Sequence, residues 1–218
     1  MLRNRLLFIV FSGFFVTGCS PDVTKPDEAP PVSPIRYVKD ISDAKKSLFI
    51  EYPSPERFSI CYGHTCRYIV DVNLSETEWR SIEKIFQNSD KSPAQEREQI
   101  QQAIGILEII VGEKTNTSAD RGGNFDGFGY QGQMDCVDES TNTTVYLTML
   151  QNRGLMKLHQ VSSRTSRGIF SLQAPHFTAV IRENESDNKF AVDSWFLENG
   201  KPPFIVPLAE WKVGWEPE

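Results

Sequence analysis

Three residues that lie far apart in the chain, Cys136, His176 and Asp193, have the side chains that nucleophilic thiol chemistry needs. A thiol at a helix N-terminus and beside an imidazolium is favoured as thiolate, because the helix dipole and the positive charge both lower its pKa. A carboxylate bound to the imidazole holds the tautomer that accepts and returns a proton. Together the three residues predict attack on a carbonyl carbon by the Cys136 sulfur.

The apolar pattern of the C-terminal part predicts a hairpin that brings His176 to Asp193. Residues 175–181 and 188–196 read as strands around the polar loop 182–187. With this six-residue loop, His176 lies directly opposite Asp193 on one face, at a Cβ separation of about 5 Å. The other face is then apolar and consists of Phe177, Ala179, Ile181, Phe190 and Val192.

The same residues also have a purely structural interpretation. His176 and Asp193 would then be a hydrogen-bonded pair, and Cys136 would be buried as a small apolar residue, as an unpaired Cys often is. In the catalytic interpretation, the side-chain amide of Gln131 or Gln133 would stabilise an oxyanion beside the Cys136 N–H. The residues alone leave both interpretations open.

The remaining cysteines have other expected roles. Cys61 and Cys66 bracket a four-residue turn between two strand-like runs, and residues that face each other across such a turn come within disulfide reach. In an oxidising compartment they predict a disulfide. The alternative, a metal site, lacks a second pair of ligands.

The first 18 residues predict a secretory signal peptide, since Arg3 and Arg5 precede an apolar run that is shorter than the about 20 residues of a membrane-spanning helix. The small residues before Cys19 resemble the lipobox of bacterial lipoproteins, which implies that Cys19 is lipidated and begins the mature protein. Ser20 then implies the outer membrane, facing the periplasm. The alternative is an ordinary signal peptide with an accidental Cys. Residues 19–35, rich in Pro and acidic residues, predict a lipidated flexible tether.

Residues 36–218 predict a single acidic domain. Loss of Arg3 and Arg5 with the signal leaves 21 of 23 basic side chains against 29 acidic ones, a net charge of −8. An acidic protein gains nothing from phosphate contacts, so nucleic acid is not an expected partner. Residues 127–132 match the glycine spacing of a dinucleotide fingerprint, but they follow no strand and lack the later acid, so no nucleotide is expected.

Capping signals mark the helices. Ser75 opens a capping box, and Ser92 followed by Pro begins a second helix that Gly112 is expected to end. Residues 135–152 predict a third helix, although their Thr content is unfavourable, and residues 155–161 predict a strand. With the hairpin, these elements predict an α+β fold in which N-terminal helices pack on an antiparallel sheet.

The motifs around the three residues resemble the transglutaminase-like branch of the papain superfamily. Residues 131–138 read Gln-Gly-Gln-Met-Asp-Cys-Val-Asp, and Pro-His-Phe-Thr around His176 and Val-Asp-Ser-Trp around Asp193 follow in the family order. In that family the Cys opens a helix, and the His and Asp come from neighbouring strands packed on it. The likeness extends over roughly residues 131–195 and is greatest to the bacterial transglutaminase-like cysteine proteinases of the periplasm.

The resemblance implies a Cys136–His176–Asp193 triad, but it does not transfer a calcium site directly, because Val137 stands where those proteinases usually carry an acid. A solvated acidic helix start that suits the helix dipole is the alternative to a calcium site. No other cofactor is expected. The weak calcium candidates are Asp135, Asp138 and Glu139.

Three functions follow from the sequence as hypotheses. The first is a cell-envelope thiol enzyme, a cysteine peptidase or a transglutaminase-like acyl transferase, that acts on a protein or peptide substrate. The second is a non-catalytic lipoprotein of the same fold that binds an envelope protein or peptidoglycan. The third is a purely structural envelope protein. His64 and His159 are expected to have structural or surface roles.

Overall fold

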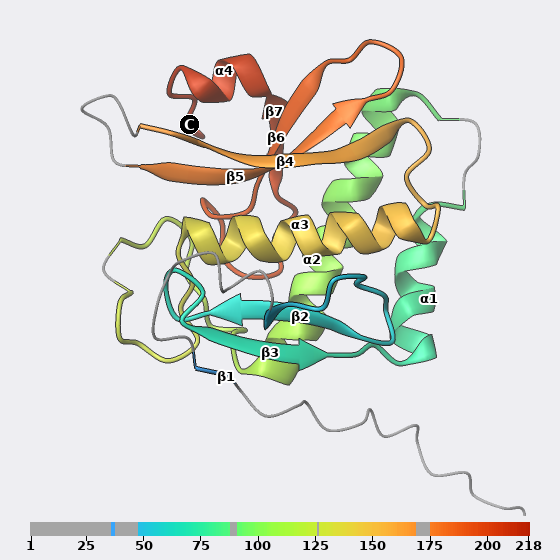
Figure 1. Ribbon diagram of the computed structural model, residues 1–218. Helices are drawn as coiled ribbons and strands as arrows, with labels where there is room; N and C mark the ends of the chain where they lie inside the picture. Colours follow the sequence, from blue (N-terminus) through green and yellow to red (C-terminus); the bar gives the residue numbers. More distant parts are fainter. Residues whose placement is uncertain (1–35, 38–47, 88–90, 126, 169–174) are drawn as a thin grey trace, which may run out of the picture.

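In the computed structural model, one central helix lies between two antiparallel sheets (Figure 1). The structure describes residues 36–37, 48–87, 91–125, 127–168 and 175–218. The expected signal peptide, the lipidated Cys19 and the tether lie outside the described residues. Helices combined with antiparallel sheets confirm the α+β class. Within the described ranges, no helix has both the length and the apolar character needed to span a bilayer.

The first sheet is built around a disulfide-closed hairpin. Its strands, in the spatial order β1-β3-β2, are β1 (Arg36–Tyr37), β2 (Phe58–Tyr62) and β3 (Tyr68–Val72). The expected disulfide between Cys61 and Cys66 is present, with an S–S distance of 2.05 Å. All five β2 side chains are buried, and this strand packs against the central helix α3 (Cys136–Asn152).

The second sheet carries the predicted hairpin. Its strands, in the order β4-β5-β6-β7, are β4 (His159–Arg167), β5 (His176–Glu183), β6 (Lys189–Asp193) and β7 (Phe204–Pro207). The strand predicted over residues 155–161 was placed too early, because it begins only at His159. The backbone N–H groups of Lys157 and Leu158 donate to the buried Glu96 carboxylate, at 2.7 and 2.8 Å, and so are not available to a strand ladder.

The two N-terminal helices begin where their caps predict. α1 (Glu76–Ile85) and α2 (Pro93–Thr115) both have complete capping boxes. The prediction that Gly112 ends α2 was wrong, because the helix continues to Thr115 and ends at Asn116 in a left-handed conformation. A Cβ at Gly112 would lie 2.8 Å from Asn199 Nδ2 and 3.0 Å from Ser118 Oγ. The absence of a side chain therefore lets these two residues pack close to the backbone of α2.

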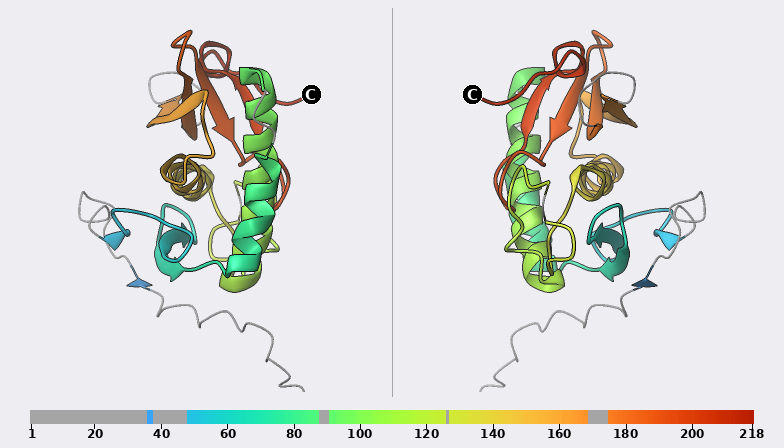
Figure 2. Two further views of the ribbon diagram at one scale, coloured as in Figure 1. Left: turned by 90° about the vertical axis from the view of Figure 1, so that its right-hand side faces the viewer. Right: turned by 90° about the vertical axis from the view of Figure 1, so that its left-hand side faces the viewer.

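The central helix α3, predicted over residues 135–152, begins one residue later, at Cys136, with Asp135 as its cap. Three of its four Thr hydroxyls donate to carbonyls one turn earlier, as Thr144 does to Ser140 at 2.7 Å, and the Thr143 hydroxyl lies 3.2 Å from Ser194 Oγ. Figure 2 shows α3 end-on between the two sheets, with α2 running along one side of both. The short helix α4 (Leu208–Lys212) packs on β6 and β7.

The β5–β6 hairpin forms with a register two residues away from the predicted one. Ala179 pairs with Val192 and Ile181 with Phe190, so the predicted placement of His176 directly opposite Asp193 was wrong. The shift arises because the strands extend closer to the turn, where Glu183 N–H donates to Asn188 O at 2.8 Å. A two-residue shift keeps every side chain on its own face, so the apolar face survives, with Ala179, Ile181 and Val192 fully buried.

Candidate active site

His176 and Asp193 form a buried pair on neighbouring strands. The His176 Nε2 atom lies 2.7 Å from Asp193 Oδ2, and the two side chains are 8% and 1% exposed. They meet diagonally across the ladder, since the register leaves both on the same face of the sheet. Because Nε2 is engaged by Asp193, Nδ1 is the ring nitrogen left to exchange a proton with a nucleophile.

Cys136 is the first residue of α3, and its thiol faces the beginning of β5. The backbone N–H of Phe177, the residue after His176, is directed at the Cys136 sulfur. α3 packs against β5, and the beginnings of these two elements lie at the same end of the molecule in Figure 1. Of the cysteines that the structure describes, Cys136 is the one outside a disulfide, and it is half-buried. The three predicted residues are therefore gathered at one end of α3.

The resting thiol is protonated at neutral pH, contrary to the expected lowering of its pKa. Burial raises the pKa of Cys136 to about 11, and the negative charges of Asp135 and Asp193 act in the same direction. The Phe177 N–H opposes this shift but does not outweigh it. Desolvation of the half-buried sulfur thus raises its pKa by more than the helix dipole lowers it. Any reaction at this site must remove the proton as the sulfur attacks.

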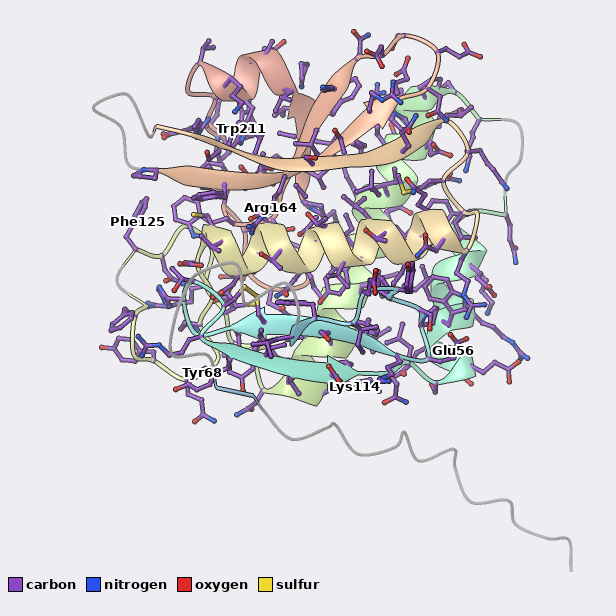
Figure 3. All side chains as sticks on the ribbon, viewed as in Figure 1. Glu56, Tyr68, Lys114, Phe125, Arg164 and Trp211 are labelled. Atoms are coloured by element: carbon purple, nitrogen blue, oxygen red, sulfur yellow. A yellow bond between two sulfur atoms is a disulfide. The ribbon has the colours of Figure 1, made fainter. Side chains whose placement is uncertain are left out.

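Arg164 on β4 adds a positive charge beside this end of α3. Its Nη1 atom donates to Val137 O at 2.9 Å and to Ser140 Oγ at 3.2 Å. The guanidinium is close enough to Cys136 for a thiolate to interact with it, although burial lowers the pKa of Arg164. Figure 3 shows Arg164 between the second sheet and α3. Sequence reasoning did not single out this residue, because nothing in its spacing links it to Cys136.

Three aromatic rings that sequence reasoning also missed enclose His176. Their ring centroids lie 4.8 Å (Trp195), 5.2 Å (Phe196) and 5.5 Å (Trp211) from that of the imidazole. Trp195 and Phe196 follow Asp193 directly, so proximity in sequence could have indicated them. Trp211 comes from α4, and its Nε1 donates to Asp193 Oδ2 at 2.6 Å.

Gln133 does not serve the role of oxyanion donor in this structure. Its Nε2 donates to Ala119 O at 2.7 Å, and its Oε1 accepts from Asn124 Nδ2 at 2.9 Å. The amide therefore closes the loop that precedes α3. Gln131, the other predicted donor, is exposed in the same loop.

The weak calcium candidates at the start of α3 are engaged in separate contacts. Asp135 caps the helix, whereas Asp138 accepts the backbone N–H groups of His64 at 2.7 Å and Cys66 at 2.5 Å. Glu139 turns inward to a buried group of acids. In the described part of the chain, the metal-type cluster found is Cys61, Cys66 and Asp138, with ligand atoms within 4.8 Å of one another, but its two sulfurs are joined in the disulfide.

A group of carboxylates is buried behind the site, where α2, α3 and the loop after β6 meet. Burial raises the pKa of Glu108 to about 8 and that of Asp120 to about 6, and it raises that of Glu139 well above the usual range. Glu139 and Asp120 share a hydrogen bond, which requires a proton. Glu108 accepts the Gly200 N–H at 3.0 Å. Glu108 and Glu139 therefore hold their protons at neutral pH, whereas Asp120, with a pKa of about 6, is mostly ionised there and accepts the hydrogen bond from Glu139.

The other two histidines lie away from the predicted triad. His159 is fully buried, and its Nδ1 lies 2.9 Å from Glu96 Oε2. His64 is buried in the disulfide loop with its ring 5.7 Å from that of Phe128. Both positions agree with the structural roles expected for them.

Comparisons of this chain with protein-family models, with curated proteins and with solved structures find no match. The site combines a protonated thiol at a helix N-terminus with an imidazole whose distal nitrogen is held by a buried carboxylate.

Proposed function

We propose that this chain is a cell-envelope thiol enzyme of the papain and transglutaminase kind, which attacks amide or peptide carbonyls through Cys136. The observation that carries the proposal is the buried His176–Asp193 hydrogen bond of 2.7 Å beside the helix start that bears Cys136. The order of the three sequence motifs supports it. The proposed setting is the periplasmic face of the outer membrane, with the protein anchored through lipid on Cys19.

Acylation begins with a neutral thiol. The Cys136 sulfur forms a bond to the carbonyl carbon while its proton moves to His176 Nδ1, and the C=O electron pair moves to the oxygen. Asp193 stabilises the imidazolium through its bond to Nε2. Collapse of the tetrahedral intermediate breaks the C–N bond, and the leaving amine takes the proton from His176. The product is a thioester on Cys136.

Deacylation decides whether the reaction is hydrolysis or transfer. Water or an amine attacks the thioester while His176 accepts its proton, which then returns to the sulfur. Two N–H groups are suited to stabilise the oxyanion in both steps. The Cys136 N–H occupies the first helical position, where it has no acceptor within the helix. The Trp195 Nε1 is buried without a hydrogen-bond partner among the described residues.

A groove beside the site offers space for a substrate. It has a volume of about 960 Å³, and Phe196 forms part of its wall while also lying 5.2 Å from His176. Arg121 and Lys201 contribute positive charge to the groove, and Glu198 contributes negative charge. The volume of the groove is within the range of ligand-binding pockets, and we propose that it holds part of the substrate next to the bond that Cys136 attacks.

A second function, binding an envelope protein or peptidoglycan without catalysis, is favoured by exposed aromatic residues. One loop carries three exposed aromatic side chains, which are 73% (Phe125), 60% (Phe128) and 67% (Tyr130) exposed. Figure 3 shows Phe125 at the outer edge of the molecule, and its ring lies 4.7 Å from that of Trp195. Exposed aromatic groups of this kind are typical of interaction surfaces.

Acetylation by p-nitrophenyl acetate separates the two functions. The enzyme should release a burst of nitrophenol and carry a hydroxylamine-labile acetyl group on Cys136, detected by mass spectrometry of peptides. Cys136→Ala should abolish the burst. Acetylation of Cys136 no faster than that of glutathione, and unchanged by His176→Gln, would instead support a non-catalytic binding protein.

A further inference from the structure

We infer that Trp211 is a positioning residue for the thiol chemistry, acting through Asp193; the inference rests on the proposed function of the site. One carboxylate oxygen, Asp193 Oδ2, lies 2.7 Å from His176 Nε2 and 2.6 Å from Trp211 Nε1. The imidazole and the indole thus bind the same atom from two different elements, β5 and α4.

The second donor on this oxygen restricts the carboxylate plane. The terminal torsion of an Asp side chain is broad, so one hydrogen bond leaves the carboxylate free to turn. Here Trp211 Nε1 holds Oδ2, and the Trp195 backbone N–H holds Oδ1 at 3.3 Å. Asp193 is 1% exposed, so water cannot readily replace a lost donor. A fixed carboxylate in turn fixes the His176 ring, whose Nδ1 must face the Cys136 sulfur.

The segment that carries Trp211 is itself anchored to the sheet. Arg167, at the end of β4, donates from Nη1 to Trp211 O at 2.7 Å and to Trp215 O at 2.6 Å. Its guanidinium also lies 4.7 Å from the centre of the Trp211 ring. Trp211 is fully buried, and Figure 3 shows it between α4 and the second sheet. The C-terminal helix therefore presents an indole N–H at a set position.

Trp211→Phe tests this role, because it removes the N–H and keeps a large aromatic ring. Trp215→Phe is the matched control, since Trp215 lies in the same segment with its ring against Phe196 and Phe204. The rate of Cys136 alkylation by iodoacetamide would be measured from pH 6 to pH 12 in the full chain. At neutral pH the reaction needs His176 to remove the proton, whereas at high pH the thiolate forms without it.

A positioning role gives a specific result. Trp211→Phe should lower the neutral-pH rate at least tenfold and leave the rate at high pH unchanged, and Trp215→Phe should change neither. Equal profiles for Trp211→Phe and the wild type would overturn the inference, as would a parallel loss over the whole pH range. A wild type that lacks a His176-dependent rate at neutral pH would overturn the proposed function itself.

A second measurement uses the wild-type fold, in case Trp211→Phe is unstable. The indole N–H resonance of Trp211 should shift when His176 is titrated with acid, because both groups share Asp193 Oδ2. The Trp215 indole resonance serves as the reference, because that ring packs against Phe196 and Phe204. A Trp211 resonance that does not respond to this titration would overturn the inference.

Discussion

Asp138 Oδ1 accepts a 2.5 Å hydrogen bond from the backbone N–H of Cys66, which ties the disulfide loop to the first turn of α3. The loop residues Gly63, His64, Thr65 and Cys66 all have positive φ angles. The backbone N–H groups of this turn converge on carboxylate oxygens, as successive N–H groups do in anion-binding turns. His64 donates to Asp138 and Thr65 donates to Asp135, so the loop holds both acids that cap the helix of Cys136.

Removal of Asp138 should therefore destabilise the fold. Asp138→Ala leaves the buried N–H groups of His64 and Cys66 without an acceptor, and we expect a loss of about 2–3 kcal/mol in the free energy of unfolding. Asp187→Ala, at an exposed turn, should leave that free energy unchanged within error. Urea denaturation measures both. An Asp138→Ala variant as stable as Asp187→Ala would show that the loop does not depend on this carboxylate.

The buried acids should make the protein less stable as the pH rises. The raised pKa values of Glu108, about 8, and Asp120, about 6, mean that the folded state keeps protons that the unfolded chain releases above about pH 4.5. The free energy of unfolding should then fall as the pH rises from 5 to 8. The Gln side chain of Glu108→Gln does not titrate, so this variant lacks the part of the loss that Glu108 causes. Its stability relative to the wild type should therefore increase from pH 5 to pH 8.

Exposed Glu98, on the same helix, provides the control for this pH series. Glu98→Gln should give a constant stability difference from the wild type between pH 5 and pH 8. If Glu108→Gln also gave a constant difference, the Glu108 carboxyl would not hold its proton in the fold.

Glu96 should have the opposite effect on the acid side. Burial opposes its ionisation, but hydrogen bonds from His159 and from the Lys157 and Leu158 backbone, with Lys91 nearby, lower its pKa to about 2. Its stabilising contribution is complete above about pH 4.5 and is lost as the pH falls through 2. Glu96→Gln should cost about 3 kcal/mol at pH 7 and flatten this acid loss. Guanidinium denaturation from pH 2 to pH 7 measures the free energy of unfolding of both proteins. If Glu96 were not ionised, the variant would differ from the wild type by the same amount at every pH.

Gln133 and Gln131 should differ in their contributions to stability. Gln133→Ala removes the donor to Ala119 O and one of the two acceptors of Asn124 Nδ2, which still donates to Arg121 O at 2.7 Å, so we expect a loss of about 2 kcal/mol. Gln131→Ala, at an exposed position, should be neutral. Thermal denaturation of the two variants provides the comparison. A stable Gln133→Ala protein with impaired acetylation of Cys136 would return Gln133 to the role of oxyanion donor.

Local signals predicted the elements of this fold better than their ends. The caps at Ser75, Ser92 and Asp135 begin helices because each satisfies backbone N–H groups within one turn of sequence. Gly112 does not end α2, because its role depends on Asn199, which approaches from a distant loop. The hairpin was predictable, but its register depends on how far the strands extend into the turn. The apolar pattern does not determine this, because a shift of two residues keeps the same side chains on the apolar face.

Parts of the candidate site depend on contacts that no sequence spacing encodes. Trp211 reaches Asp193 from a separate helix, and Arg164 reaches α3 from β4. The raised pKa of Cys136 reflects burial by packed elements, whereas the helix dipole that sequence reasoning used is a local property. The buried position of Glu108 in an otherwise amphipathic-looking helix is likewise set by the loop after β6, which supplies the Gly200 N–H.

The most direct test of the central claim is the rate at which iodoacetamide alkylates Cys136 at pH 7, resolved by peptide mass spectrometry, in the wild type and in His176→Gln. If His176 removes the thiol proton, the variant should react at least a hundredfold more slowly, because a general base contributes a factor of about 10²–10⁴. The control His64→Gln should react like the wild type. Equal rates for the wild type and His176→Gln would contradict the account, because the Cys136 sulfur would then lose its proton without the imidazole.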